Sequence, residues 1–364
     1  MPVPAADDGP KRLLAIDGGG IRGLIALEIL DAVERTLAAR TNAGPDFVLA
    51  DWFHYIGGTS TGAIIATGLS LGMTVEQIRS FYLGQGRAMF GRARLLNRLR
   101  YRFEGGPLAE ALRGAFGATR TMGSADLRTL LLVVLRNATT DSPWPLSSNP
   151  AARFNDRALA DCNLDLPLWQ VVRASSAAPT YFPPEAVEIG SRRFLFEDGG
   201  VTPYNNPAFL LFLMATSAPY RLQWPTGPER LKLVSVGTGT MPQDGTGLRV
   251  GGMSMLFEAR AVPKALMFAA MNQQDLLCRM FGRTVFGAPL DGEVGSLVGD
   301  SSSLPELFTY ARYNVDLTRA GLDALGLSDI DAADVQRLDG FQYVDQLRRV
   351  GHAAADQVQM AHFT

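Results

Sequence analysis

The apolar residues of the chain fall into short continuous runs separated by stretches of mixed character. Residues 12–16 (RLLAI), 130–136 (LLLVVLR) and 232–236 (KLVSV) are runs of strand length. Such runs are typical of strands that are covered on both faces of a sheet. Three weaker candidate strands are residues 53–56, 194–197 and 311–317.

Helical patterns lie between these runs. Leu27, Leu30, Val33 and Leu37 recur at helical spacing, and residues 61–71 form an apolar block that predicts a buried helix. The Pro- and Ser-rich stretch 143–150 predicts a loop. Because strands and helices alternate, the sequence predicts an α/β fold with a mostly parallel central sheet and helices on both faces.

No linker divides the chain. We therefore expect a flexible tail over residues 1–11 and a single domain over 12–364, in which a motif-bearing core (12–240) is surrounded by the remaining part (241–364).

Composition narrows the class of protein. With 364 residues, 47% of them hydrophobic and 19% charged, the chain can bury a large core. A net charge of −2 gives no reason to expect a nucleic-acid polymer as partner. Cys162 and Cys278 are too few for a disulfide framework, which predicts two free thiols in a reducing compartment. The N-terminus lacks the pattern of a signal peptide, and the longest apolar block, 209–215, is too short to span a bilayer, so we expect a cytoplasmic protein.

A glycine-rich turn, DGGGIRG at 17–23, connects the first predicted strand to the first helix. Such a turn directs free N–H groups at an anion, which can be a phosphate or the oxyanion of an acyl transfer. The spacing of Gly18, Gly20 and Gly23 also satisfies the dinucleotide fingerprint G-x-G-x-x-G. A tight turn with no ligand is the third interpretation.

A second motif, GTSTG at 58–62, has the pattern G-x-S-x-G between a strand and an apolar helix. Small flanking residues permit the sharp turn that exposes a nucleophilic serine, here Ser60, with the Thr61 N–H as an oxyanion donor. The alternative is a serine that merely caps the helix.

A serine nucleophile needs a base, and the chain offers three histidines and one well-placed aspartate. Asp198 precedes two glycines at the end of a predicted strand. His54 lies too close to Ser60 in sequence, and His362 is two residues from the end. His352 fits the order of common Ser-Asp-His hydrolases but has no active-site context, so a Ser60–Asp198 dyad is favoured and a triad with His352 stays open.

The three motifs, in this order, resemble the patatin-like phospholipases. The stretch at 174–184 (ASSAAPTYFPP) and VGTG at 236–239 resemble further elements of that family. The resemblance implies a three-layer α/β/α fold, Ser60 as nucleophile and Asp198 as general base. It also implies an oxyanion hole framed by Gly18, Gly19 and Gly20, with Arg22 beside it. The implied activity is hydrolysis of glycerophospholipid esters (phospholipase A type) through an acyl-enzyme, with no cofactor and no metal.

The segments that would admit the substrate or regulate the enzyme have weaker sequence signals than the catalytic motifs. The Met- and Phe-rich stretch 253–271 predicts a core helix or a membrane-touching lid. An arginine-rich patch predicts either contact with anionic lipid or a phosphate-bearing ligand, or else a solvated face; its central residues are Arg92, Arg94, Arg98 and Arg100. Some bacterial members of the family are antiviral effectors activated by cyclic nucleotides. The resemblance therefore also implies a cyclic nucleotide as a candidate activator of this protein. A homo-oligomer and action at the membrane surface are further expectations.

One alternative belongs to another class of protein. A Rossmann-type dinucleotide-binding oxidoreductase would explain the glycine fingerprint, with Asp46 or Asp51 as the acidic residue about 20 positions further on. It would leave Ser60 and Asp198 unexplained.

Overall fold

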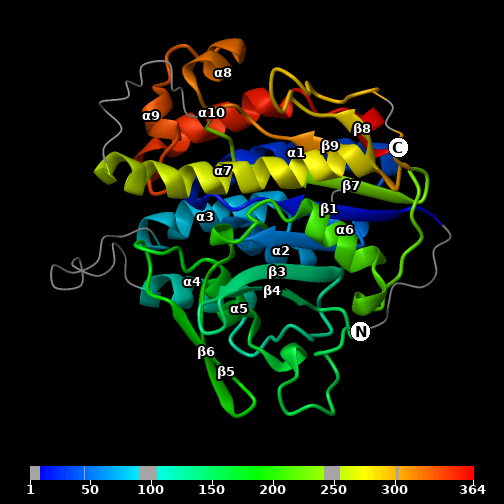
Figure 1. The fold of residues 1–364 in the computed structure, drawn as a ribbon, viewed down its shortest axis with the longest axis vertical. Coiled ribbons are helices and arrows are strands. Elements are labelled where there is room, and N and C mark those ends of the chain that lie inside the picture. The colour runs from blue at the N-terminus through cyan, green and yellow to red at the C-terminus, as the bar shows by residue number, and fades with distance from the viewer. Residues whose placement is uncertain (1–8, 45, 90–104, 242–254, 301–302) are drawn as a thin grey trace.

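The computed structural model describes residues 9–44, 46–89, 105–241, 255–300 and 303–364, and its centre is a nine-stranded sheet (Figure 1). The strand order is β5-β6-β3-β2-β1-β7-β9-β8, and β4 pairs with β3 outside this path. The strands are β1 (Lys11–Ile16), β2 (Tyr55–Thr59), β3 (Leu130–Asn137), β4 (Ser142–Ser147), β5 (Glu185–Ile189), β6 (Arg192–Asp198), β7 (Leu231–Val236), β8 (Gly282–Phe286) and β9 (Phe308–Tyr313).

The middle of the sheet is parallel, from β3 through β2, β1, β7 and β9 to β8. Only one end is antiparallel, because β4 and β6 both run against β3, and β5 runs against β6. The predicted mostly parallel sheet is therefore confirmed.

Helices cover both faces of the sheet, which makes three layers. Along β1, Leu14 and Ile16 belong to the core shared with α1 and α2, whereas Leu13 and Ala15 belong to the core shared with α6. This alternation explains why the strands are continuously apolar in sequence. The helices are α1 (Gly23–Thr41), α2 (Thr61–Ser70), α3 (Val75–Met89), α4 (Gly105–Phe116), α5 (Leu168–Ser175), α6 (Ala208–Thr216), α7 (Met255–Phe281), α8 (Arg319–Ala324), α9 (Ala332–Val335) and α10 (Val344–Ala355).

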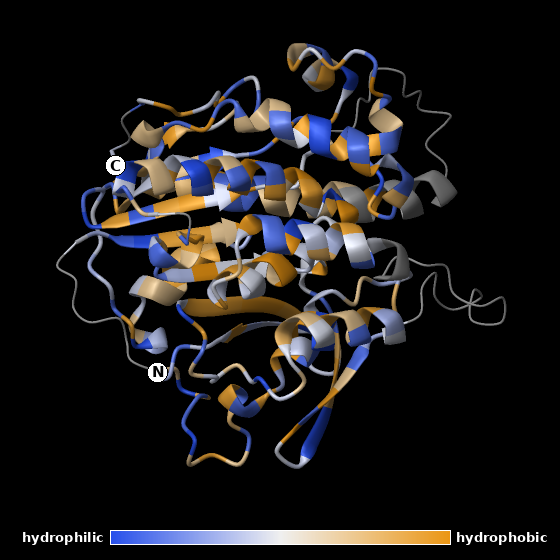
Figure 2. Ribbon diagram, turned by 180° about the vertical axis from the view of Figure 1, so that it is seen from behind, coloured by the Kyte–Doolittle hydropathy of each residue, from blue (hydrophilic) through white to orange (hydrophobic). Residues whose placement is uncertain are grey.

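The figures show how the layers are arranged. The long helix α7 crosses the face of the sheet that also carries α6 (Figure 1). From behind, the strands are predominantly hydrophobic while the covering helices alternate between polar and apolar residues (Figure 2). The C-terminal part of the chain is integral to this arrangement, because β9 pairs with β7 and α10 packs along α1.

Several boundaries differ from the sequence predictions. The predicted loop 143–150 is wrong at its start, because Ser142–Ser147 forms β4. Pro143 and Pro145 are tolerated there because β4 is an edge strand, where a missing N–H breaks no central ladder. The strand predicted at 53–56 is shifted and includes both glycines before Ser60. The strand predicted at 311–317 begins and ends earlier, at Phe308–Tyr313.

Three further observations concern the sequence expectations. Lys11, placed in the predicted tail, already belongs to β1, while residues 1–8 lie outside the described part. Cys162 and Cys278 are buried free thiols. In the residues that the structure describes, no helix has both the length and the apolar character needed to cross a bilayer.

Candidate active site

The three sequence motifs meet at the carboxyl ends of the parallel strands. Ile16, the last residue of β1, lies in register with Gly58 of β2 on one side and with Val236 of β7 on the other. Asp198 ends β6, where it pairs with Leu135 in the last part of β3. The loops that follow these strands therefore open on one edge of the sheet, which is where α/β folds place their ligand sites.

Ser60 occupies a sharp turn between β2 and α2. Its backbone has φ 56° and ψ −121°, a conformation that a residue with a side chain adopts only under strain. The flanking glycines are required by close approach: a Cβ at Gly58 would lie 2.1 Å from the Gly62 carbonyl oxygen, and a Cβ at Gly62 would lie 2.2 Å from that of Ile16. The G-x-S-x-G pattern therefore has the geometry of a nucleophile elbow.

Ser60 and Asp198 are in direct contact. The Ser60 Oγ donates a hydrogen bond of 2.6 Å to Oδ2 of Asp198. Both residues are buried, with 9% and 5% of their surface exposed. The other carboxylate oxygen, Oδ1, accepts from the Gly200 N–H at 2.7 Å, which fixes the carboxylate plane at the end of β6.

The environment of Asp198 favours its protonated form. Burial raises the pKa of Asp198 to about 6, while the hydrogen bonds from Ser60 and Gly200 and the charge of Arg173 act in the opposite direction. A carboxylate with this pKa is a stronger base than an exposed aspartate and is still ionised near pH 7.

A second serine holds the elbow in place. The Ser175 Oγ accepts a hydrogen bond from the Ser60 N–H at 2.9 Å and donates to the Val134 carbonyl at 2.6 Å. It thereby connects the elbow to α5 and β3. The stretch 174–184 marked this region in the sequence, but no feature of it singled out Ser175.

The glycine turn lies beside the elbow, and the structure does not leave all three of its predicted oxyanion N–H groups free. The Gly18 N–H donates to the Asn205 carbonyl at 3.1 Å, so this group is not a free oxyanion donor. The Gly18 carbonyl in turn accepts from the Thr238 hydroxyl at 2.7 Å. Among the described residues, the N–H groups of Gly19 and Gly20 donate no hydrogen bond, and they remain as candidate donors.

The structure places Thr61 and Arg22, the other two residues predicted at the oxyanion hole, next to this turn. Thr61 is the first residue of α2, so its N–H has no acceptor within the helix. Arg22 is buried, and its Nε lies 3.4 Å from the Gly19 carbonyl. Burial lowers the pKa of Arg22 to about 10, partly offset by the charge of Asp17, so the guanidinium remains a cation beside the turn at neutral pH.

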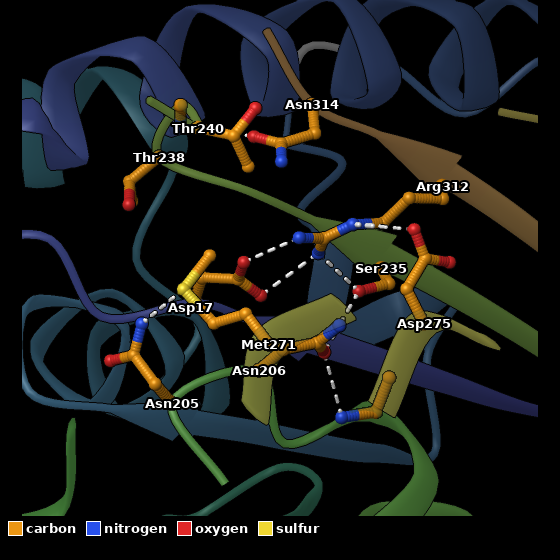
Figure 3. Close-up of polar contacts among 12 residues, drawn as sticks. Asp17, Asn205, Asn206, Ser235, Thr238, Thr240, Met271, Asp275, Arg312 and Asn314 are labelled. Carbon is orange, nitrogen blue, oxygen red and sulfur yellow. Dashed lines mark hydrogen bonds and ion pairs between the residues drawn. The ribbon is translucent and has the colours of Figure 1, made fainter. Parts of the chain in front are cut away.

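A buried ion pair with Arg312 holds Asp17, the first residue of the glycine turn, in place (Figure 3). Asp17 is fully buried, and both of its carboxylate oxygens accept from the guanidinium of Arg312 on β9. Arg312 also donates to the Ser235 hydroxyl at 2.7 Å, and its Nε lies 4.0 Å from Asp275 of α7. No sequence motif marks Arg312, which is 295 positions from its partner.

The same view shows that α7 reaches the turn. The Met271 sulfur lies 3.0 Å from Nδ2 of Asn205, the residue whose carbonyl accepts from Gly18 (Figure 3). Residues 255–271 of the predicted stretch belong to a longer helix, Met255–Phe281, whose second half packs against the loops of the site. Val262 and Leu266 of its first half are exposed.

The histidines lie elsewhere. Nε2 of His352 is 3.4 Å from Glu28 of α1, the helix along which α10 packs. His54 accepts from the Arg12 N–H, and His362 contacts the Tyr313 hydroxyl. The structure therefore does not bring His352 to Ser60, and the alternative of a Ser-His-Asp triad is not supported by the geometry.

The arginine patch and the possibility of a metal site depend on which residues the structure describes. The arginine patch, Arg92, Arg94, Arg98 and Arg100, lies outside them. Within them, no group of three or more His, Cys, Asp or Glu side chains could hold a metal ion.

Fold and site together define an α/β protein with a serine–aspartate pair at a strand-to-helix elbow. The family model for patatin-like phospholipases matches residues 14–212, more than half of the chain, and the chain belongs to this family. The match contradicts the oxidoreductase alternative; Asp51, one of its two acidic candidates, is ion-paired with Arg128.

Named relatives agree with this assignment. A "cGAMP-activated phospholipase" of Escherichia coli is 32% identical over 57% of this chain and 56% of its own length. A second one, from Vibrio cholerae, is 30% identical over 58% and 60%. Patatin-17 of Solanum cardiophyllum is 30% identical over 63% and 60%. The chain thus spans less than two thirds of the length of these relatives.

Proposed function

We propose that this chain is a serine acyl hydrolase that cleaves the carboxylic esters of glycerophospholipids through Ser60 and Asp198. The observation that carries the proposal is the 2.6 Å hydrogen bond from the Ser60 Oγ to Asp198 at a strained elbow. Family membership supports the reaction class, and the names of the bacterial relatives support a phospholipid substrate.

Acylation begins when the Ser60 Oγ attacks the ester carbonyl carbon and its proton passes to Oδ2 of Asp198. The carbonyl oxygen becomes an oxyanion, which the N–H groups of Gly19, Gly20 and Thr61 stabilise. One such donor typically contributes about 3–4 kcal/mol to lowering the barrier. As the C–O bond of the ester breaks, Asp198 returns the proton to the leaving alcohol, and the acyl group remains on Ser60.

Deacylation repeats these steps with water. Asp198 accepts a proton from a water molecule, the resulting hydroxide attacks the acyl carbon, and Ser60 leaves with the proton from Asp198. The products are a lysophospholipid and a fatty acid. The chemistry requires no metal or organic cofactor.

The test compares wild type with Ser60→Ala and Asp198→Asn on mixed phospholipid vesicles, with products measured by mass spectrometry. Both variants are expected to lose hydrolysis, while His352→Ala keeps it. A fluorophosphonate probe should label wild type and not Ser60→Ala. Loss of activity in His352→Ala alone would replace the dyad by a triad.

We further propose regulation by a cyclic nucleotide, in line with the names of two relatives, and action at the cytoplasmic membrane surface. Hydrolysis should then rise when cyclic di- or trinucleotides are added, and sedimentation with and without them will show whether a homo-oligomer accompanies activation. Full activity without any nucleotide, unchanged by a panel of them, would refute the regulatory part alone.

A further inference from the structure

Asn205 lies between the two glycine motifs of the site. It belongs to the loop between β6 and α6, and it is buried. A Cβ built on Gly18 of the glycine turn would lie 2.3 Å from Oδ1 of Asn205, and a Cβ built on Gly200, which follows the base, would lie 2.8 Å from the same atom. Real Cβ atoms essentially never come so close to another heavy atom. One amide oxygen is therefore the nearest obstacle to a side chain at both positions, which are far apart in sequence.

The amide of Asn205 is held in one orientation. Its Nδ2 donates to the Met271 sulfur at 3.0 Å and to the Gly18 carbonyl at 3.4 Å (Figure 3). Both neighbours are acceptors, so the nitrogen faces them and Oδ1 is directed at the two glycines. The amide could make room for a methyl group on either glycine only by giving up these bonds.

The backbone of Asn205 is anchored as well. Its carbonyl accepts from the Gly18 N–H at 3.1 Å. Before it in the chain, the Tyr204 carbonyl accepts from the Thr59 hydroxyl at 2.7 Å. After it, Oδ1 of Asn206 accepts at 3.1 Å from the first N–H of α6. Asn205 is thus a fixed point on which two turns of the site rest.

These contacts concern two groups whose separation matters for the reaction. Gly18 directly precedes the two candidate oxyanion donors in the chain, and the Gly200 N–H holds Oδ1 of Asp198 at 2.7 Å. Misplacing a group by about 1 Å can lower a rate about 100-fold. A side chain that touches both glycines therefore controls how far the oxyanion donors lie from the base.

We propose that Asn205 is a positioning residue, whose side chain keeps the oxyanion turn and the loop of the base at the separation that the tetrahedral intermediate requires. The inference rests on the proposed function. In this role Asn205 acts through Gly18 and Gly200 rather than on the substrate. Met271 connects α7 to the same role, because its sulfur holds the amide in place.

The first test measures kcat and KM of Asn205→Ala with dihexanoylphosphatidylcholine below its aggregation concentration. The kcat should fall about 10- to 100-fold while KM changes by less than about threefold, because the oxyanion forms only after the substrate has bound. Asn155→Ala is the matched control. Asn155 is a buried asparagine whose Nδ2 donates to the carbonyls of Ser147 and Asn149, so its loss should lower stability and leave kcat unchanged.

The second test needs no substrate. Gly18→Ala should lower the melting temperature, because the added methyl group meets Oδ1 of Asn205. In the Asn205→Ala background the same change should lower the melting temperature by about half as much or less, and Gly200→Ala should behave in the same way.

A further variant covers the case in which Asn205→Ala does not fold. Met271→Leu nearly conserves volume and removes the sulfur that accepts from Nδ2. It should lower kcat about threefold or more with KM unchanged. Met214→Leu is its control, since the Met214 sulfur lies 4.0 Å from the Tyr55 hydroxyl on α6, and kcat should stay at the wild-type value.

The outcomes are distinguishable. An unchanged kcat in Asn205→Ala, a loss no larger than that of Asn155→Ala, or a loss that lies in KM would overturn the positioning role. Additive changes in melting temperature would overturn it too, because they would show that the amide does not exclude side chains at the two glycines. If wild type cleaves no phospholipid, the proposed function fails, while non-additive melting temperatures still support the placement of Asn205 between the two turns.

Discussion

Replacing the candidate base Asp198 by asparagine should make the protein more stable, by an amount that grows as the pH rises from about 4 to above 6. In the folded protein the pKa of Asp198 is raised to about 6 by burial, from an ordinary value of 3.8. The folded state therefore binds a proton more tightly than the unfolded chain. Stability contributed by this group is complete below pH 4 and is lost as the pH rises through 6.

The magnitude follows from the shift. A difference of about 2 pKa units, at 1.36 kcal/mol per unit, corresponds to a destabilisation of about 3 kcal/mol at pH 8 and about half of that at pH 5. Asparagine has nearly the same shape, can accept the Gly200 N–H and can donate to the Ser60 Oγ, so Asp198→Asn removes the buried charge while keeping the contacts.

Urea denaturation of wild type and Asp198→Asn at pH 5, 6, 7 and 8 measures the effect. The variant should be inactive and gain about 3 kcal/mol at the highest pH, with the gain shrinking toward pH 5. Asp356→Asn, at an exposed position, controls for the loss of one negative charge. A gain that is the same at every pH, or a loss of stability at pH 8, would refute the argument that burial of an ionised carboxylate sets the pKa.

Three further results are expected. The kcat/KM of wild type should rise tenfold per pH unit below an apparent pKa of about 6 and level off above it, because Asp198 must be ionised to accept the proton; a profile flat from pH 5 to 8 would contradict this. Ser175→Ala should lower kcat about tenfold and stability by about 1–3 kcal/mol, because the Ser60 N–H loses its acceptor; kinetics and urea denaturation measure both, and unchanged kcat would remove Ser175 from the positioning of the elbow. Arg312→Met should destabilise by about 3–5 kcal/mol by leaving the Asp17 carboxylate buried and unpaired, and Asp17→Asn in the same chain should restore most of the loss in denaturation experiments; a single variant as stable as wild type would show that the pair is dispensable.

The parts of the fold that could be predicted are those with a local signal. The apolar runs of β1, β3 and β7 are long enough to be recognised, and the glycines around Ser60 have a steric reason that a short pattern encodes. The prolines of β4 concealed a strand, because a proline is compatible with a strand only at an edge, and edges are set by the order of strands in space.

The candidate site was predictable where motifs follow strands, and it was not where partners are distant in sequence. Gly18 belongs to the glycine turn, but its N–H is taken by the carbonyl of Asn205, which only the folded chain brings near. Arg312 carries no motif of its own. Its significance comes from burial, since a guanidinium removed from water needs a partner that sequence spacing does not reveal.

The pairing of Asp17 with Arg312 implies that the first glycine motif and strand β9 cannot vary independently. The matched family region ends at residue 212, a hundred positions before the arginine that neutralises its first motif. Grafting that region onto the C-terminal portion of another family member would therefore leave the Asp17 carboxylate buried without a cation. The graft would avoid this only if the other protein carries an arginine at the same place on β9. Any chimera or directed-evolution library built from this protein should treat residues 17 and 312 as one unit of exchange.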